Sequence, residues 1–187
     1  MIVPTAIAAA SPLLAWRDPV YIASGFAGAA ALALLLIQPL LAGGYLPGLA
    51  ARRGRSVHRW AGGALVAFVV AHVAGLWITS PPDAIDALLF ISPTPFSPWG
   101  VVAMWAAFAS ALLAALRGKL RIRPGAWRIV HTSLAAVIVT GSVVHALLVE
   151  GPMGPASKAA FCVLVLAVTA KVLADLRPWT LLTRRRG

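Results

Sequence analysis

Charged residues and cysteine are both scarce in this sequence. Charged side chains make up 11% of the 187 residues, whereas about a quarter of the residues in soluble proteins are charged. Cys162 is the single cysteine, so the chain cannot form an internal disulfide or a cysteine-based zinc or iron–sulfur site. A glycine-rich dinucleotide-binding fingerprint after a strand pattern is also missing, which excludes a nucleotide site of that kind.

The residues that are present are mainly apolar. Hydrophobic residues make up 60% of the chain and the mean hydropathy is +0.89, which is typical of an integral membrane protein. The formal net charge is +11, but the basic residues occur in short clusters between long uncharged stretches, as membrane topology requires. The expected partner is therefore the lipid bilayer, and nucleic acid is not expected.

Five segments are long and apolar enough to cross a bilayer, which takes about 20 mostly apolar residues. They lie at about residues 21–42, 57–79, 98–116, 128–149 and 158–176. Connectors rich in proline and glycine separate them, and these residues end helices. The sequence therefore predicts an all-α, integral membrane helical bundle with about five transmembrane helices.

The basic residues give this bundle an orientation. They gather in two connectors that lie on the same side and in the C-terminal tail: Arg52, Arg53, Arg55, Arg117, Lys119, Arg121, Arg123, Arg184, Arg185 and Arg186. The positive-inside rule makes that side cytoplasmic. We therefore expect a multi-pass protein of a bacterial-type inner (plasma) membrane, with its N-terminus outside and its C-terminus in the cytoplasm.

Two shorter segments flank the predicted bundle of residues 20–176. Residues 1–19 have no basic residue before Arg17, so they lack the positive start of a secretory signal and are expected to be an interfacial segment. Residues 177–187 are expected to form a basic cytoplasmic tail. The long outside connector SPPDAIDALLFISPTPFSP contains an apolar patch, so we expect it to lie against the membrane surface.

All four histidines occur in two of the spans, at equal spacing. The segment VHRWAGGALVAFVVAH contains His58 and His72, and VHTSLAAVIVTGSVVH contains His131 and His145. Fourteen positions along a helix put two side chains about 40° apart around it and about 21 Å apart along it. Two histidines of one span therefore share a face but cannot share a metal ion, so each needs a partner on another helix.

The topology indicates which histidines meet. The second and fourth spans are separated by one span, so they run in the same direction, and His58 and His131 each follow a basic connector. These two are expected at one depth, and His72 and His145 at a second depth. Two imidazoles that face each other suit an iron at the centre of a flat macrocycle. The sequence therefore predicts two bis-histidine haems, with no separate catalytic residue.

Small and basic residues near the histidines support this interpretation. Gly62, Ala135 and Gly141 lie one turn from a histidine and are expected to leave room for a porphyrin. Haem propionates need cations at the cytoplasmic-side site, and the nearby candidates are Arg55, Arg59 and Arg128. Trp127 lies near the start of a span and is expected to be an interfacial anchor.

Other roles for the histidines remain open at this stage. Each could simply hydrogen-bond to a neighbouring helix. A histidine-based proton or metal transporter is the main alternative, although no acidic residue occurs in the histidine-bearing spans before Glu150. Zinc or copper transport would need three or four ligands at one depth. A membrane anchor subunit, whose haems hold a complex together, is a third option.

The two histidine segments, each preceded by a basic connector (RRGRSVHRW and RIRPGAWRIVH), resemble the ferric reductase-like transmembrane domain. That family includes ferric reductases, NADPH oxidases and the haem-binding subunit of the bacterial periplasmic methionine sulfoxide reductase system. The resemblance covers roughly residues 20–176. It implies that His58 and His131 hold an inner b-type haem, that His72 and His145 hold an outer one, and that electrons cross the bilayer through them.

The sequence departs from the larger members of this family. Those relatives have a sixth span and a cytoplasmic flavin- and nicotinamide-binding domain, whereas this chain ends at RRRG. The resemblance therefore implies an oxidoreductase component served by a separate donor, either a flavoprotein reductase or a quinol, with flavin or quinone supplied by that partner. The basic inner face would suit an acidic donor protein. Ferric iron, oxygen or a periplasmic redox partner would accept electrons outside.

Overall fold

The computed structural model describes residues 17–49, 51–150 and 154–176, and all of its regular structure is helical. The helices are α2 (Pro19–Gly43), α3 (Ala51–Thr79), α4 (Pro81–Leu88), α5 (Ser97–Leu116), α6 (Pro124–Leu148) and α7 (Pro155–Leu176). All except α4 are long and apolar enough to cross a membrane. The predicted all-α bundle with five spanning helices is confirmed. Most of the predicted N-terminal segment and the whole of the predicted tail lie outside the described residues.

Proline, glycine and capping residues mark the helix ends, as the breaker pattern predicted. Proline occupies the first turn of α2, α4, α5 and α6, where the missing N–H has no intrahelical partner in any case. The Asp18 carboxylate accepts a hydrogen bond from the Val20 N–H at 2.6 Å, which caps α2. Gly44, at φ 72°, ends this helix in the left-handed conformation that favours glycine.

Two boundaries differ from the sequence prediction. Helix α3 begins at Ala51, several residues before the predicted span, because arginine is a good helix former and the helix continues through the basic RRGRS segment. The connector that was predicted to lie outside contains a short helix, α4, which starts at Pro81. The residues that follow it, Leu89, Phe90 and Ile91, are more than half exposed.

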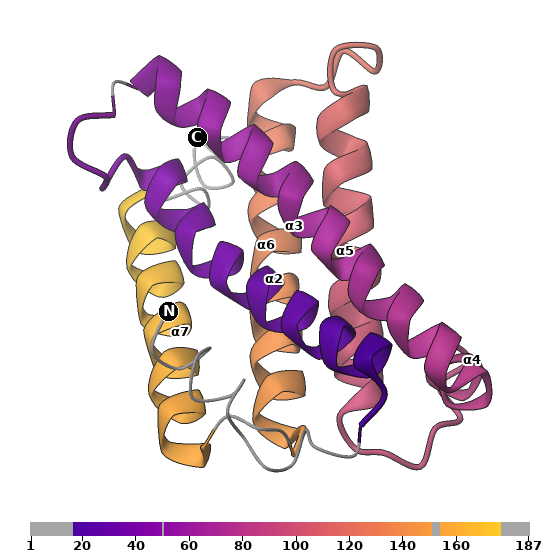
Figure 1. Cartoon of the computed structure of the whole chain (residues 1–187). Helices are drawn as coiled ribbons and strands as arrows, with labels where there is room; N and C mark the ends of the chain where they lie inside the picture. Colours follow the sequence, from indigo (N-terminus) through magenta and orange to yellow (C-terminus); the bar gives the residue numbers. More distant parts are fainter. Residues whose placement is uncertain (1–16, 50, 151–153, 177–187) are drawn as a thin grey trace.

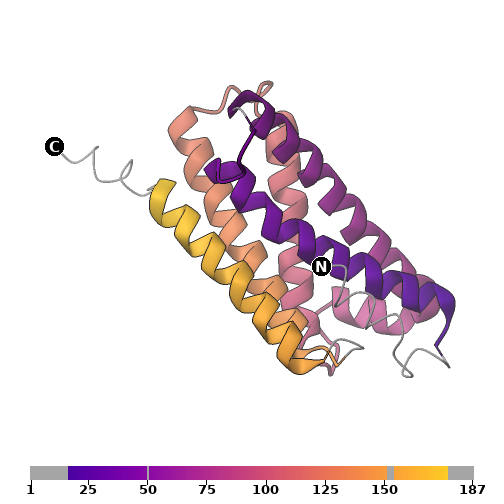
Figure 2. The same cartoon turned by 60° about the vertical axis from the view of Figure 1, so that its left-hand side comes forward.

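Four of the five long helices form two packed pairs, and the fifth helix joins the pairs (Figures 1 and 2). Helix α2 packs along α3, and α5 packs along α6. Helix α7 contacts both α2 and α6 and so connects the pairs. By contrast, α3 and α6 have little direct contact. The two histidine-bearing helices therefore stand apart within the bundle, and each is supported by a neighbour of its own.

The core of the bundle is built from small and branched apolar side chains. Its members come from every long helix: Leu35, Leu65, Ala106, Ala107, Ile138, Val139, Val143, Cys162 and Val165. Cys162 and Val165 on α7 are the most completely buried. The single cysteine therefore acts as a small apolar side chain at the junction of the two pairs.

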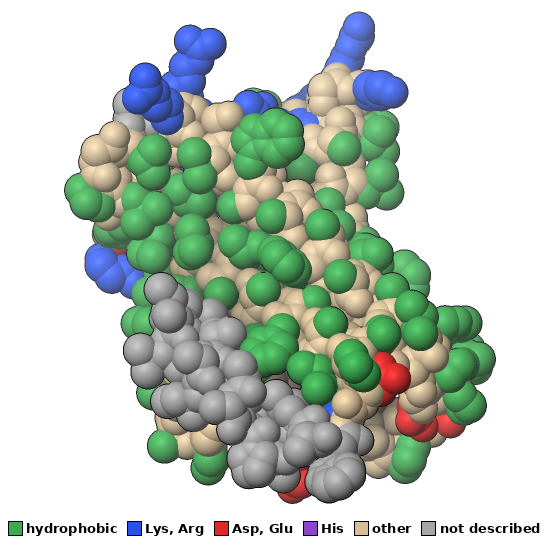
Figure 3. All heavy atoms as spheres, viewed as in Figure 1, with side chains coloured by type: hydrophobic (Ala, Val, Ile, Leu, Met, Phe, Trp, Pro, Cys, Tyr) green, Lys and Arg blue, Asp and Glu red, His purple; other side chains and the backbone are tan. Residues whose placement is uncertain are grey.

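Charge divides the two ends of the molecule (Figure 3). Lysine and arginine side chains gather at the end where α3 begins and α5 meets α6, whereas the aspartate and glutamate side chains lie at the opposite end, apart from Asp175, which pairs with Lys171 on α7. We call the first, which carries Arg52, Arg53, Arg55, Arg117, Lys119, Arg121 and Arg123, the basic end. The second, which carries Asp18, Asp83, Asp86 and Glu150, is the acidic end. The apolar surface between them is what a lipid bilayer would cover.

The close packing of α2 against α3 predicts an effect of Gly75→Ala. A Cβ at Gly75 would lie 2.5 Å from the Ser24 Cβ, so the helices would have to separate, at a cost of about 1–3 kcal/mol. We expect a lower midpoint of thermal unfolding in detergent. The matched control is Gly63→Ala on the same helix, whose Cβ would meet nothing within 4 Å. Equal midpoints for the two variants would show that this contact is unimportant.

Candidate haem-binding site

The four histidines meet in two pairs, each formed between α3 and α6. The ring centres of His58 and His131 are 6.2 Å apart, and those of His72 and His145 are 6.4 Å apart. His58 and His131 form the basic-end pair, and His72 and His145 form the acidic-end pair. The helical rise puts the two pairs about 21 Å apart along α3. The pairing therefore follows the register that the sequence predicted.

The separation within each pair suits one metal ion between the rings. Imidazole nitrogen binds a metal at about 2 Å, so two rings on opposite sides of one ion have centres roughly 6 Å apart. The ring planes cross at 78° in the basic-end pair and at 81° in the acidic-end pair. In the described part of the chain, no hydrogen bond joins the two rings of either pair.

Main-chain carbonyls orient both rings of the acidic-end pair. The His72 Nδ1 lies 2.8 Å from the Ser24 carbonyl oxygen on α2, and the His145 Nδ1 lies 2.9 Å from the Phe96 carbonyl oxygen at the start of α5. A carbonyl can only accept, so each Nδ1 carries the proton in the neutral ring, and Nε2 keeps its lone pair. This is the usual arrangement of a histidine that binds a metal.

Glycine makes both of these hydrogen bonds possible. The Phe96 carbonyl also accepts a hydrogen bond from the Gly100 N–H at 3.3 Å, so the imidazole has to approach it over Gly100. A Cβ there would lie 2.6 Å from the His145 Nδ1, and a Cβ at Gly28 would lie 3.0 Å from the His72 Nδ1. Sequence reasoning missed both glycines, because glycine is frequent throughout membrane helices.

Gln38 on α2 supports the first ring of the basic-end pair. Its carbonyl oxygen lies 3.3 Å from the His58 Nδ1, and its side-chain Nε2 donates to the His58 carbonyl oxygen at 3.3 Å. A Cβ at Gly62 would lie 3.1 Å from this Nε2. Gln38 therefore bonds to the ring and to the main chain of the same histidine, which fixes the position of α3 against α2.

The second ring of the basic-end pair has different neighbours. The His131 Nδ1 lies 3.0 Å from the hydroxyl oxygen of Ser110 on α5. The indole of Trp127 stacks on the His131 ring, with centres 4.7 Å apart and planes at 13°. The guanidinium of Arg117 lies over the Trp127 indole, 4.8 Å from the centre of that ring. Trp127 was expected as an interfacial anchor, and no sequence pattern indicated its contact with a histidine.

The three arginines expected near the haem propionates lie at the basic end, but not in equivalent surroundings. Arg128 donates to the Leu176 carbonyl oxygen at 2.9 Å, so it caps the last turn of α7. Arg55 and Arg59 are exposed and have no ion-pair partner among the residues that the structure describes. These two side chains are therefore the ones free to meet an anionic group.

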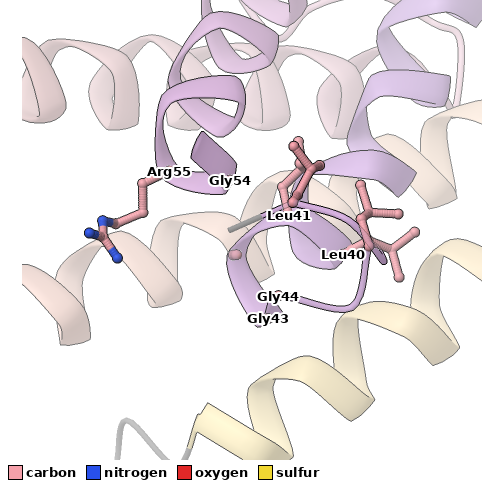
Figure 4. Close-up of a pocket in the computed structure, with 9 residues that line it drawn as sticks. Leu40, Leu41, Gly43, Gly44, Gly54 and Arg55 are labelled. Carbon is pink, nitrogen blue, oxygen red and sulfur yellow. The ribbon is translucent and has the colours of Figure 1, made fainter. Parts of the chain in front are cut away.

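A small pocket at the basic end is separate from the histidine pairs (Figure 4). It has a volume of about 250 Å³ and lies where α2 turns into α3, beside Gly43, Gly44 and Gly54. Arg55 extends away from the glycine turn. No histidine lines the pocket, and its volume is below the roughly 300–1,000 Å³ of typical ligand sites. It is therefore not the place of a macrocycle.

Two of the three small residues expected to leave room for a porphyrin serve helix packing instead. A Cβ at Gly141 would lie 2.9 Å from the Trp99 carbonyl oxygen and 3.1 Å from the Ala103 Cβ, so Gly141 allows α6 to pack on α5. Gly62 likewise makes room for Gln38. Helices α3 and α6 have little direct contact, and the distances between the paired rings fit one iron at each level.

The geometry argues against the simpler roles of the histidines. Hydrogen bonding to a neighbouring helix accounts for all four Nδ1 atoms and leaves every Nε2 without a hydrogen bond in the described residues. Within the same residues, no three side chains of histidine, cysteine, aspartate or glutamate lie close enough to hold one metal ion. Two histidines at each level, with ring centres 6.2 Å and 6.4 Å apart, would suit a metal whose remaining ligands come from a macrocycle.

Comparison with known proteins agrees with the resemblance seen in the sequence. No curated protein and no solved structure matches the chain. The family described as "Ferric reductase like transmembrane component" matches residues 16–142, which include His58, His72 and His131 and end just before His145. The match covers more than half of the 187 residues. The chain therefore belongs to the ferric reductase-like transmembrane family.

Proposed function

We propose that residues 20–176 carry electrons across the membrane through two bis-histidine b-type haems. The observation that carries this proposal is the state of the eight imidazole nitrogens. Each Nδ1 has a hydrogen-bond partner on a neighbouring helix, and the Nε2 atoms of each facing pair remain for one iron. Membership of the family supports electron transfer as the general role.

In this proposal the haems would carry out the redox chemistry, and the protein would bind them and set their positions. A bound b-type haem supplies a one-electron Fe(III)/Fe(II) couple. His58 with His131, and His72 with His145, would hold the two haems at different depths. The apolar helices around them exclude water, so the two positions form a dry route between the ends of the bundle. No side chain of the chain needs to act as a separate catalytic group.

The charge of the two ends suggests the direction of transfer. We assign the basic end to the cytoplasm of a bacterial-type inner membrane by the positive-inside rule, so the N-terminus faces outward. Electrons would arrive at this end from a flavoprotein reductase or a quinol. Its seven lysine and arginine side chains at the start of α3 and in the α5–α6 connection would attract an acidic donor protein. Ferric iron or a periplasmic redox partner would take electrons at the acidic end.

Haem content is the first test of this proposal. The visible spectrum of purified protein should show a reduced b-type band with two haems per chain. His72→Ala or His145→Ala should lower the content to one haem, because one of the two histidines that would hold the acidic-end haem is lost. Thr169→Ala, at a buried position on α7, is the control and should keep both. Colourless protein that transports protons or metal ions would contradict the proposal and support a transporter.

The side from which each haem is reduced is a second test. In vesicles, the His72→Ala variant should keep a haem that is reduced by a donor added at the basic end, yet it should fail to reduce an acceptor at the acidic end. The His131→Ala variant should block reduction from the basic end, because the first carrier is missing. Electron transfer that is unchanged in both variants, measured by stopped-flow absorbance, would exclude a route through the two pairs.

The glycines beneath the acidic-end rings give a third test. Gly100→Ala places a Cβ in the path of the His145 Nδ1, so the ring loses its carbonyl partner. Loss of such supporting hydrogen bonds typically costs about 10–100-fold in affinity for the bound metal group. Haem titration should show weaker binding at one site only. Gly25→Ala, whose Cβ would meet nothing within 4 Å, should bind both haems normally, and equal losses in the two variants would contradict this role.

A further inference from the structure

His131 is held differently from the other three histidines. Three of the four Nδ1 atoms face main-chain carbonyls, which cannot be changed by substitution, whereas the His131 Nδ1 faces the hydroxyl of Ser110. Ser110 is buried, so water does not compete freely for this hydrogen bond. With Nε2 used for a metal, the neutral ring must carry its proton on Nδ1, and the Ser110 oxygen therefore accepts.

A cation also approaches this ring through an aromatic side chain. Trp127 and His131 are one helical turn apart on α6 and lie nearly parallel, and Arg117, at the end of α5, lies over Trp127. The three side chains form a stack from the surface of the basic end to the imidazole. In the described residues, no aromatic–cation stack of this kind reaches the acidic-end pair: Phe96 meets the His145 ring edge-on, at 77°.

We propose that Arg117, Trp127 and Ser110 set the reduction potential of the basic-end site through His131, separately from the acidic-end site. This inference rests on the proposed function, because it requires a haem between His58 and His131. Trp127 and Ser110 are positioning residues, since they fix the plane and the proton of the ring. Arg117 contributes a positive charge at a distance that the stack determines.

The charge and the hydroxyl act in opposite directions. A nearby cation disfavours the more positive ferric state, so Arg117 raises the reduction potential of the basic-end iron. A hydrogen bond from Nδ1–H to an acceptor makes the imidazole a stronger donor to the metal, which favours the ferric state. The Ser110 hydroxyl therefore lowers the same potential. Arg117 and Ser110 therefore shift the reduction potential of the basic-end site in opposite directions. At the acidic-end site, main-chain carbonyls bind both rings, so no such side chains act there in the described part of the chain.

The effect of the Arg117 charge on the reduction potential depends on its distance from the iron and on its exposure to solvent. Arg117 is exposed, so solvent weakens its interaction with the iron. Coulomb's law with the effective dielectric constant of a protein near its surface then gives roughly a three- to tenfold change in the ratio of reduced to oxidised iron at a fixed potential. A change of this size is measurable in an optical redox titration.

The test is a redox titration of haem-loaded full-length variants. Arg117→Gln should lower the midpoint potential of the basic-end haem, so that the ratio of reduced to oxidised iron at a fixed potential falls roughly three- to tenfold. Ser110→Ala should raise this midpoint. The acidic-end midpoint should stay unchanged in both. His72→Ala, which keeps only the basic-end haem, identifies which midpoint belongs to it. Lys119→Gln removes the same charge from the same connection without touching the stack, and should move neither midpoint.

Conservative variants separate tuning from loss of structure. Ser110→Thr keeps the hydroxyl and Arg117→Lys keeps the charge, so each should restore most of the normal midpoint. Shifts of equal sign in Arg117→Gln and Ser110→Ala, equal shifts of both haems, or a shift in Lys119→Gln would overturn this inference. These outcomes need protein that binds two haems. Wild-type protein without haem would instead refute the proposed function, so the two failures are distinguishable.

Discussion

The hydrogen bond from each histidine to the helix beside it is the interaction on which the rest of the structure depends. Both histidines of α3 bond to α2, and both histidines of α6 bond to α5. Each packed pair of helices therefore aims two Nε2 atoms away from itself. When the pairs are brought together by α7, the rings face each other across the gap between α3 and α6. The position of each ring is thus supported within a pair of helices and not by the ring that it faces.

The membrane environment explains why the hydrogen bonds take this form. In an apolar surrounding without water, a polar ring needs a partner inside the protein. The carbonyls of Ser24 and Phe96 each serve as that partner for a histidine of the adjacent helix, and glycine four residues later leaves the approach open. Close helix packing and ligand orientation are therefore one feature of the structure. A larger side chain at either glycine would disturb both.

The acidic-end and basic-end pairs differ in whether main-chain atoms or side chains hold the histidine rings. At the acidic end, main-chain atoms hold both rings, so the orientation follows from the fold itself. At the basic end, a main-chain carbonyl still holds the His58 ring, but side chains hold the other one: Ser110 bonds to His131, and Trp127 covers the His131 ring. Side chains can be exchanged without changing the fold. The level that faces the donor in our proposal is therefore the one whose properties substitution can adjust.

The sequence alone determined the five spanning helices, their charge asymmetry and the register in which His58 meets His131 and His72 meets His145, because these follow from apolar length, connector charge and helical period. It could not determine the supporting residues. Gly28, Gly100, Gln38 and Ser110 resemble many other residues of membrane helices, and Gly62 and Gly141 were assigned to a slot although they serve helix packing. Which carbonyl, hydroxyl or indole meets an imidazole depends on the rotation and separation of neighbouring helices, and only the packed tertiary structure fixes those.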